Sequence, residues 1–122
     1  MRYLAVLLFL LAPCLHAAPS APEGQKIEAL IEFVEQLGDA KFVRNGTAYD
    51  AKAAASHLRL KLREAGNRIK TADDFIRLVA SRSSVSGKPY EIVFPDGRRS
   101  TSEAFLRARL QALEEDSRKE SQ

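Results

Sequence analysis

Apolar residues recur at helical spacing in four stretches of the chain and alternate at strand spacing in two shorter ones. The helical stretches lie at about residues 27–37, 51–65, 72–80 and 100–114. Each strand-like stretch, 41–49 and 90–101, contains a turn signal, Asn45-Gly46 in the first and Pro95-Asp96-Gly97 in the second. The pattern predicts a single α+β domain with about four helices, two short β-hairpins and a small antiparallel sheet. It does not decide whether the two hairpins join in one sheet.

Polar residues and glycines mark the ends of the predicted helices. Asp50 is a good N-cap for the second helix, which is expected to stop at Gly66 because glycine readily takes the conformation of a C-terminal cap. Thr71 followed by Asp74 has the spacing of a capping box and opens the third helix. The last helix is expected to start near Ser100, where the same spacing recurs.

The second helix carries apolar residues on two sides. Its main apolar face consists of Ala51, Ala54, Ala55, Leu58, Leu62 and Ala65. Ala53 and Leu60 lie on nearly the opposite side, with His57 beside them. A helix that is apolar on two sides is usually packed on two sides. The pattern therefore predicts a central position for this helix and a buried His57.

The N-terminus has the three parts of a secretory signal peptide. Arg2 is followed by an unbroken apolar run at 4–12, and a short segment then ends in the small residue Ala17. We expect residues 1–17 to be a signal peptide that is cleaved after Ala17, which predicts an exported, periplasmic protein. Cys14 leaves with the signal peptide, so the mature chain contains no cysteine.

The rest of the chain divides into three parts. Residues 18–25 are rich in Pro, Ala and Ser near their start and are expected to be a flexible lead-in. Residues 26–114 form the predicted globular domain, and residues 115–122 are a charged tail. No stretch after the signal peptide has the roughly 20 apolar residues that a membrane-spanning helix needs. The expected mature protein therefore has no membrane span.

The charge of the predicted mature chain is nearly balanced. Without Arg2 it has 18 Lys and Arg residues against 16 Asp and Glu residues, a net charge of +2. Proteins that bind nucleic acid usually present a strongly basic face. We therefore expect no nucleic-acid partner.

Several stretches resemble the YfeK-like family of small proteobacterial envelope proteins. They are Phe42-Val43-Arg44-Asn45-Gly46, Ser56-His57-Leu58-Arg59-Leu60-Lys61-Leu62, Arg68-Ile69-Lys70-Thr71-Ala72 with Phe75-Ile76, and Ser83-Ser84-Val85-Ser86-Gly87-Lys88-Pro89-Tyr90. The resemblance covers about residues 26–113 and implies a periplasmic location. It assigns no catalytic residue, because the domain of this family has no assigned function.

His57 is the one candidate general base, since the ordinary pKa of histidine suits proton transfer near neutral pH. A small hydrolase would pair it with Ser84 or Ser86, but a serine nucleophile also needs an adjacent base and an orienting group. The sequence contains no Gly-x-Ser-x-Gly elbow. The predicted mature chain has one histidine and no cysteine, which cannot build a typical zinc site, and no motif implies a cofactor. The alternative interpretation is a buried, hydrogen-bonded histidine, with the loop serines capping a helix end and satisfying backbone groups.

Basic residues suggest a second kind of site. Arginine suits phosphate and carboxylate groups, and the candidates for a convergent anion site are Arg44, Arg59, Arg63, Arg68 and Lys88. The favoured members are Arg59, Arg68 and Lys88, with His57, Ser84 and Tyr90 as further binding candidates. Our leading hypothesis is a non-catalytic binding module for a protein or an anionic envelope component. The alternative hypothesis is the hydrolase described above.

Overall fold

The structure is a computed structural model that describes residues 21–122. The elements, in chain order, are α1 (Ala21–Glu35), β1 (Lys41–Arg44), β2 (Thr47–Tyr49), α2 (Ala51–Ala65), η1 (Gly66–Arg68), α3 (Ala72–Phe75), η2 (Ile76–Ala80), β3 (Glu91–Val93), β4 (Arg99–Thr101) and α4 (Ser102–Glu120). These elements confirm the predicted α+β fold. The predicted signal peptide, the cleavage point at Ala17 and residues 18–20 lie outside the described residues.

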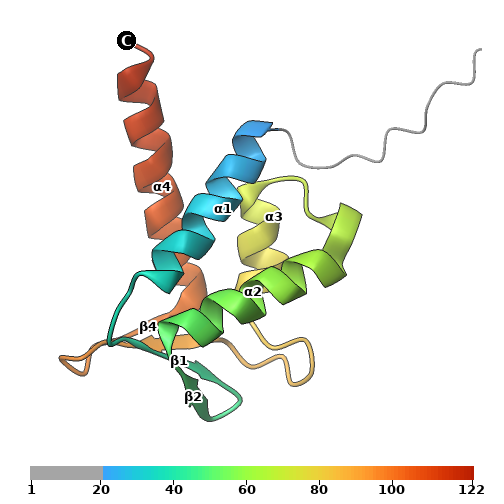
Figure 1. Ribbon diagram of the computed structural model, residues 1–122, viewed down its shortest axis with the longest axis vertical. Helices are drawn as coiled ribbons and strands as arrows, with labels where there is room; N and C mark the ends of the chain where they lie inside the picture. The colour runs from blue at the N-terminus through green and yellow to red at the C-terminus, as the bar shows by residue number, and fades with distance from the viewer. Residues whose placement is uncertain (1–20) are drawn as a thin grey trace, which may run out of the picture.

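The two hairpins join in a single four-stranded antiparallel sheet. The strand order is β2-β1-β3-β4, so β1 and β3 lie in the middle and connect the hairpins. Phe42 pairs with Ile92 across this junction. The helices lie on one side of the sheet, and α2 crosses the molecule next to it (Figure 1). This arrangement answers the question that the sequence pattern left open.

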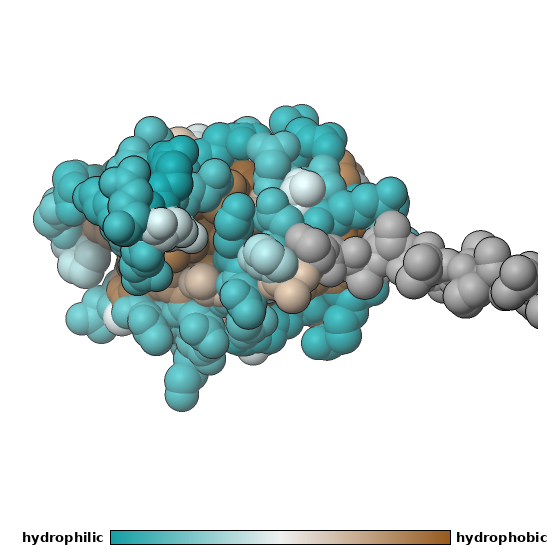
Figure 2. All heavy atoms as spheres, turned by 90° about the horizontal axis from the view of Figure 1, so that it is seen from above, coloured by the Kyte–Doolittle hydropathy of each residue, from teal (hydrophilic) through white to brown (hydrophobic). Residues whose placement is uncertain are grey.

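The hydrophobic core lies between the sheet and the helices. The largest fully buried side chains are Phe75, Leu30, Ile31, Ile69, Ile76, Ile92, Leu106, Val34 and Val79. The face in Figure 2 is mostly hydrophilic, and hydrophobic side chains show only between hydrophilic ones. Within residues 21–122, no helix has both the length and the apolar character that membrane crossing requires.

The predicted N-caps of two helices are confirmed. The Asp50 carboxylate accepts a hydrogen bond from the amide of Ala53, 2.8 Å away. Thr71 and Asp74 form the expected reciprocal capping box. The start of the last helix differs from the prediction, because Thr101 rather than Ser100 is its N-cap. The chain remains paired as strand β4 up to Thr101, so the helix cannot begin earlier.

Both ends of the described chain are more helical than expected. α1 begins at Ala21, so residues 21–25 are helical rather than a flexible lead-in. A Glu23 carboxylate oxygen accepts a hydrogen bond from the amide of Ala72 at 3.1 Å, which ties this first turn to the start of α3. Pro22 has no backbone N–H. It fits the first helical turn because the N–H groups of that turn have no partner within the helix. At the other end, α4 continues to Glu120, so most of the charged tail is an exposed helix.

The second apolar face of α2 is not packed as predicted. Ala53 is exposed, Leu60 is 44% exposed and His57 is half-buried. The main face, which includes the buried Leu58, packs into the core. Ala53 and His57 border a cavity, and Leu60 does not line it. The prediction of a helix packed on two sides is therefore wrong.

The Asn45-Gly46 turn is confirmed, and its first residue also holds a distant loop. Asn45 and Gly46 have φ values of 51° and 78°, as the tight hairpin turn requires. The Asn45 amide nitrogen donates to the hydroxyl of Ser83 at 3.1 Å, and its carbonyl accepts a hydrogen bond from Ser86. The hairpin thereby holds the serine loop against the body of the domain.

Asn45→Gly is expected to loosen this loop while it preserves the turn. Glycine takes the left-handed conformation without strain, so the main loss is the two side-chain hydrogen bonds. A hydrogen bond contributes about 1 kcal/mol, so the amide of Gly87, which donates to the carbonyl of Ser83, should exchange with solvent about 5- to 30-fold faster. Hydrogen-exchange NMR measures this rate. Asn45→Asp keeps the oxygen acceptor and should show a smaller change; an unchanged rate at Gly87 in Asn45→Gly would contradict the account.

Candidate functional site

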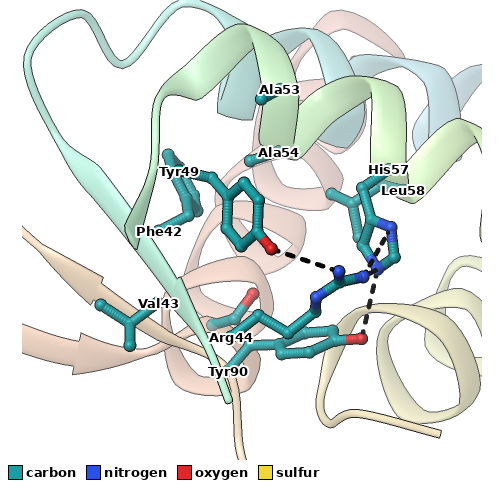
Figure 3. Close-up of a pocket in the computed structure, with 10 residues that line it drawn as sticks. Phe42, Val43, Arg44, Tyr49, Ala53, Ala54, His57, Leu58 and Tyr90 are labelled. Atoms are coloured by element: carbon teal, nitrogen blue, oxygen red, sulfur yellow. Dashed lines mark hydrogen bonds between the residues drawn. The ribbon is translucent and has the colours of Figure 1, made fainter. Parts of the chain in front are cut away.

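A cavity of about 150 Å³ lies between α2 and the hairpin formed by β1 and β2 (Figure 3). Its apolar wall consists of Phe42, Val43, Ala53, Ala54 and Leu58. Its polar lining consists of Arg44, Tyr49, His57, Tyr90 and Ser102. In Figure 3 the polar ends of Arg44, Tyr49, His57 and Tyr90 lie close together. The cavity therefore combines an apolar wall with one polar cluster.

Arg44 reaches from the end of β1 across this cavity. Its terminal nitrogen Nη1 lies 2.7 Å from Nε2 and 3.0 Å from Nδ1 of the His57 ring. The other terminal nitrogen donates to the hydroxyl of Tyr49 at 3.3 Å. Among residues 21–122, none of the ion pairs includes Arg44. The half-buried guanidinium therefore has its hydrogen bonds within residues 21–122 to His57 and Tyr49.

The contact with Arg44 favours the neutral form of His57. A guanidinium can only donate hydrogen bonds, so the ring must offer an unprotonated nitrogen as the acceptor. Burial is the main cause that lowers the pKa of His57 below its ordinary value of 6.5, and the positive charges of Arg44 and Lys61 lower it further. Glu64 acts in the opposite direction. The ring therefore accepts rather than donates toward Arg44 near neutral pH.

Lys61 lies one helical turn after His57 and is buried. Its ammonium donates to the carbonyl of Val79 at 2.7 Å, to the carbonyl of Arg82 at 3.1 Å and to the hydroxyl of Tyr90 at 2.9 Å. The carbonyls at a helix end have no partner within the helix, and Lys61 supplies one here. Burial is the main cause that lowers the pKa of Lys61, and no ion pair among residues 21–122 includes it.

Tyr90 connects Lys61 to the ring of His57. Its hydroxyl accepts a hydrogen bond from Lys61 and lies 3.5 Å from Nε2 of His57. Burial raises the pKa of Tyr90, so the hydroxyl is neutral near pH 7. Arg44 and Lys61 thus bring two positive charges to one region without a paired carboxylate. An anion that entered the cavity would meet the guanidinium of Arg44, which has no carboxylate partner among residues 21–122.

Of the six favoured binding residues, only His57 and Tyr90 line the cavity, and Arg44 from the wider set of basic candidates joins them. The favoured basic residues Arg59, Arg68 and Lys88 do not line it. Arg59 forms ion pairs with Glu28 and Glu35 of α1 at 3.0 and 3.3 Å. Arg68 donates to the carbonyl of Ala65 at 3.2 Å, and Lys88 is exposed in the serine loop. Arg59 and Arg68 therefore have their partners outside the cavity.

The geometry that a hydrolase would need is not present in the described part of the chain. The His57 ring forms its hydrogen bonds there with Arg44 and Tyr90, and none with a serine hydroxyl. Ser84 is exposed, and the hydroxyl of Ser86 bonds to Asn45 and accepts from the amide of Lys88. Neither serine lines the cavity. The loop serines instead satisfy loop groups, as the alternative interpretation expected.

Comparison with known proteins places the chain in a family. The model of a family of unknown function, DUF5329, matches residues 21–114. The chain belongs to DUF5329. The uncharacterized protein YfeK of Salmonella typhimurium is 48% identical over 86 residues, which are 70% of this chain and 72% of YfeK. No solved structure matches the chain. The resemblance seen in the sequence is confirmed, and the DUF5329 domain includes the helical turn at Ala21 that was expected to be flexible.

The favoured candidates did not include four polar residues in or beside the cavity of this chain: Arg44, Tyr49, Lys61 and Ser102. One signal was available for Lys61, because residues four apart share a helix face and His57 precedes it by four. Arg44 and Tyr49 flank the predicted hairpin turn, so their proximity also followed from the predicted strands. Nothing in the sequence indicated that α2 would place His57 over that hairpin.

Proposed function

We propose that this DUF5329 chain is a non-catalytic periplasmic binding module, and that its cavity binds an anionic group of an envelope component through Arg44. The observation that supports this most strongly is the half-buried guanidinium of Arg44, which is bonded to neutral side chains beside an apolar cavity. Guanidinium groups recognise carboxylates and phosphates by charge-assisted hydrogen bonds. The signal-peptide pattern of residues 1–17 supports the periplasmic part of the proposal.

The size of the cavity limits what enters it. A dry protein cavity of about 150 Å³ accommodates benzene, whereas sites for drug-sized ligands measure about 300–1,000 Å³. The cavity of this chain, also about 150 Å³, therefore has room for one compact end group of a ligand. The rest of a larger envelope molecule would remain outside.

Arg44→Gln is expected to weaken the binding of small aromatic anions about 10- to 100-fold. The substitution removes the charge, and a hydrogen bond to a charged group contributes about 1.5–3 kcal/mol. Benzoate, phenyl phosphate and benzenesulfonate are suitable probes, with uncharged benzyl alcohol for comparison. Thermal unfolding in the presence of each probe measures the effect, because a ligand at 100 times its Kd stabilises the folded state by about 2.7 kcal/mol.

Arg63→Gln is the control, because Arg63 is exposed on α2 and does not line the cavity. The proposal predicts that at least one anion stabilises the wild type and Arg63→Gln but not Arg44→Gln. Equal stabilisation of all three proteins, equal stabilisation by benzyl alcohol, or no stabilisation by any anion would count against the proposed function.

A further inference from the structure

One donor nitrogen of Arg44 contacts the ring of His57, a side chain whose charge depends on pH. In the free site, Nη1 of Arg44 lies within hydrogen-bond distance of both ring nitrogens of His57. A ligand oxygen that takes this donor displaces it from the ring nitrogen. An unprotonated ring nitrogen cannot donate to that oxygen, because both atoms are then acceptors. Protonation of the ring converts this conflict into a second hydrogen bond.

We infer that the group bound at this site is a carboxylate on a compact apolar body, and that His57 takes up one proton when it binds. This inference rests on the proposed function and specifies its ligand. One carboxylate oxygen accepts from Arg44 and the other accepts from the protonated His57 ring. The proton comes from solvent, and no covalent bond forms or breaks. The apolar body occupies the space beside Phe42 and Leu58.

The charged and titratable groups around His57 support this coupling. Arg44 approaches the ring from β1, and Lys61 and Glu64 lie on α2 itself. Tyr90 approaches from the segment before β3, and the Tyr90 hydroxyl is 3.5 Å from the ring. In the free protein, burial and the two cations lower the pKa of His57. A bound carboxylate adds a negative charge at hydrogen-bond distance, which raises that pKa. The complex then holds more protons than the free protein at pH values between the two pKa values.

The number of available donors favours a carboxylate over a phosphate. Lys61 uses its three donors on Val79, Arg82 and Tyr90. The site therefore offers one guanidinium and one imidazolium, which can each donate to one of the two oxygens of a carboxylate. A phosphate monoester carries up to two charges and three acceptor oxygens. It would bring more charge and more polar oxygens out of water beside the apolar wall, so its burial costs more than that of a carboxylate.

Two sources share the inferred chemistry, a free small carboxylic acid and the C-terminal residue of a peptide. Benzoate represents the first, and N-acetyl-phenylalanine, with its amine blocked and its carboxylate free, represents the second. Their neutral amides, benzamide and N-acetyl-phenylalaninamide, keep the apolar body but lack the charge. Phenyl phosphate tests whether the site binds a phosphate instead of a carboxylate. Preference for one of the two acids identifies the source, and both acids stay ionised above about pH 5.5.

Isothermal titration calorimetry of the full chain between about pH 7.5 and pH 5.5 tests the inference. We expect at least one acid to bind and its amide not to bind. Between the pKa of His57 in the free protein and its pKa in the complex, the affinity for the acid should rise by up to about tenfold for each unit that the pH falls. Titrations in two buffers with different ionisation enthalpies should show uptake of up to one proton. His57→Gln should still bind through Arg44, with an affinity that no longer depends on pH.

Each contrary result overturns one part of the inference or the whole of it. An affinity that is independent of pH, or proton uptake that persists in His57→Gln, overturns the role of His57. Amides that bind as tightly as the acids, or no binding by either acid, overturn the carboxylate. If phenyl phosphate alone binds and requires Arg44, the carboxylate inference fails while the proposed function remains. NMR titration of the His57 ring, assigned with His57→Gln, should show the pKa of the ring rising when the acid is added.

Discussion

Lys61→Met is expected to lower the free energy of unfolding by about 2–3 kcal/mol. The ammonium is the hydrogen-bond donor to two backbone carbonyls and to the hydroxyl of Tyr90. A buried polar group that loses its partner costs about 1–3 kcal/mol, while the removal of a buried charge returns part of that cost. Methionine keeps most of the packing of the lysine stem. Urea unfolding of the wild type and the variant measures the difference.

The same substitution should show a characteristic dependence on pH. The pKa of Lys61 is lowered from 10.5 in the folded protein, so the unfolded chain binds more protons than the folded one between the two pKa values. The stability of the wild type therefore rises with pH as the pH approaches 10.5, and the variant lacks this contribution. The difference between the two proteins should widen as the pH rises.

Lys52→Met is the control for this prediction. Lys52 is exposed on the same helix, and exposed substitutions usually change stability by less than about 0.5 kcal/mol. If Lys61→Met were as stable as the wild type, or if Lys52→Met lost as much stability, the role assigned to the buried ammonium would be wrong.

Phe75→Ala is expected to lower the free energy of unfolding by about 3–5 kcal/mol. Phe75 is fully buried, at the junction of α3 and η2 where these elements meet the other helices. Truncation of a fully buried phenylalanine loses its transfer free energy and leaves a cavity. A domain of this size has a total stability of about 5–15 kcal/mol, so the variant should unfold at a much lower urea concentration.

Phe105→Ala provides the comparison for Phe75→Ala. Phe105 is only partly buried and contacts the rings of Phe33 and Phe94, with centroid distances of 5.5 and 5.8 Å. Its truncation should cost clearly less, about 1–2 kcal/mol. A loss for Phe75→Ala that is no larger than that for Phe105→Ala would contradict the position assigned to Phe75 in the core.

Local features of the fold could be predicted from the sequence because their causes are local. The Asn45-Gly46 turn requires two residues that tolerate positive φ, and the sequence supplies them. Asp50 and Thr71 cap helices through atoms three residues away. The helix start at Ala21 was missed because its support comes from Ala72, about 50 residues further along the chain. Composition at 18–25 could not show that contact.

The site was predicted less well because tertiary contacts determine it. Arg44 and His57 are 13 residues apart and meet only when α2 folds back over the β1–β2 hairpin. Periodicity placed His57 correctly beside an apolar side of α2, but it could not distinguish a packed layer from a cavity. The burial of Lys61 was unexpected for the same reason, since its partners lie 18 to 29 residues further along the chain.

Photo-crosslinking in living cells tests most directly whether the cavity binds an anionic molecule through Arg44. A diazirine-bearing amino acid at Ala53, which is exposed and lines the cavity, would trap the bound group. The same amino acid at Ala108, which is exposed on α4 away from the cavity lining, is the control. We predict an adduct with an anionic molecule at position 53 that is absent at position 108 and is lost in Arg44→Gln. Equal labelling at both positions, or an adduct that persists in Arg44→Gln, would contradict the account.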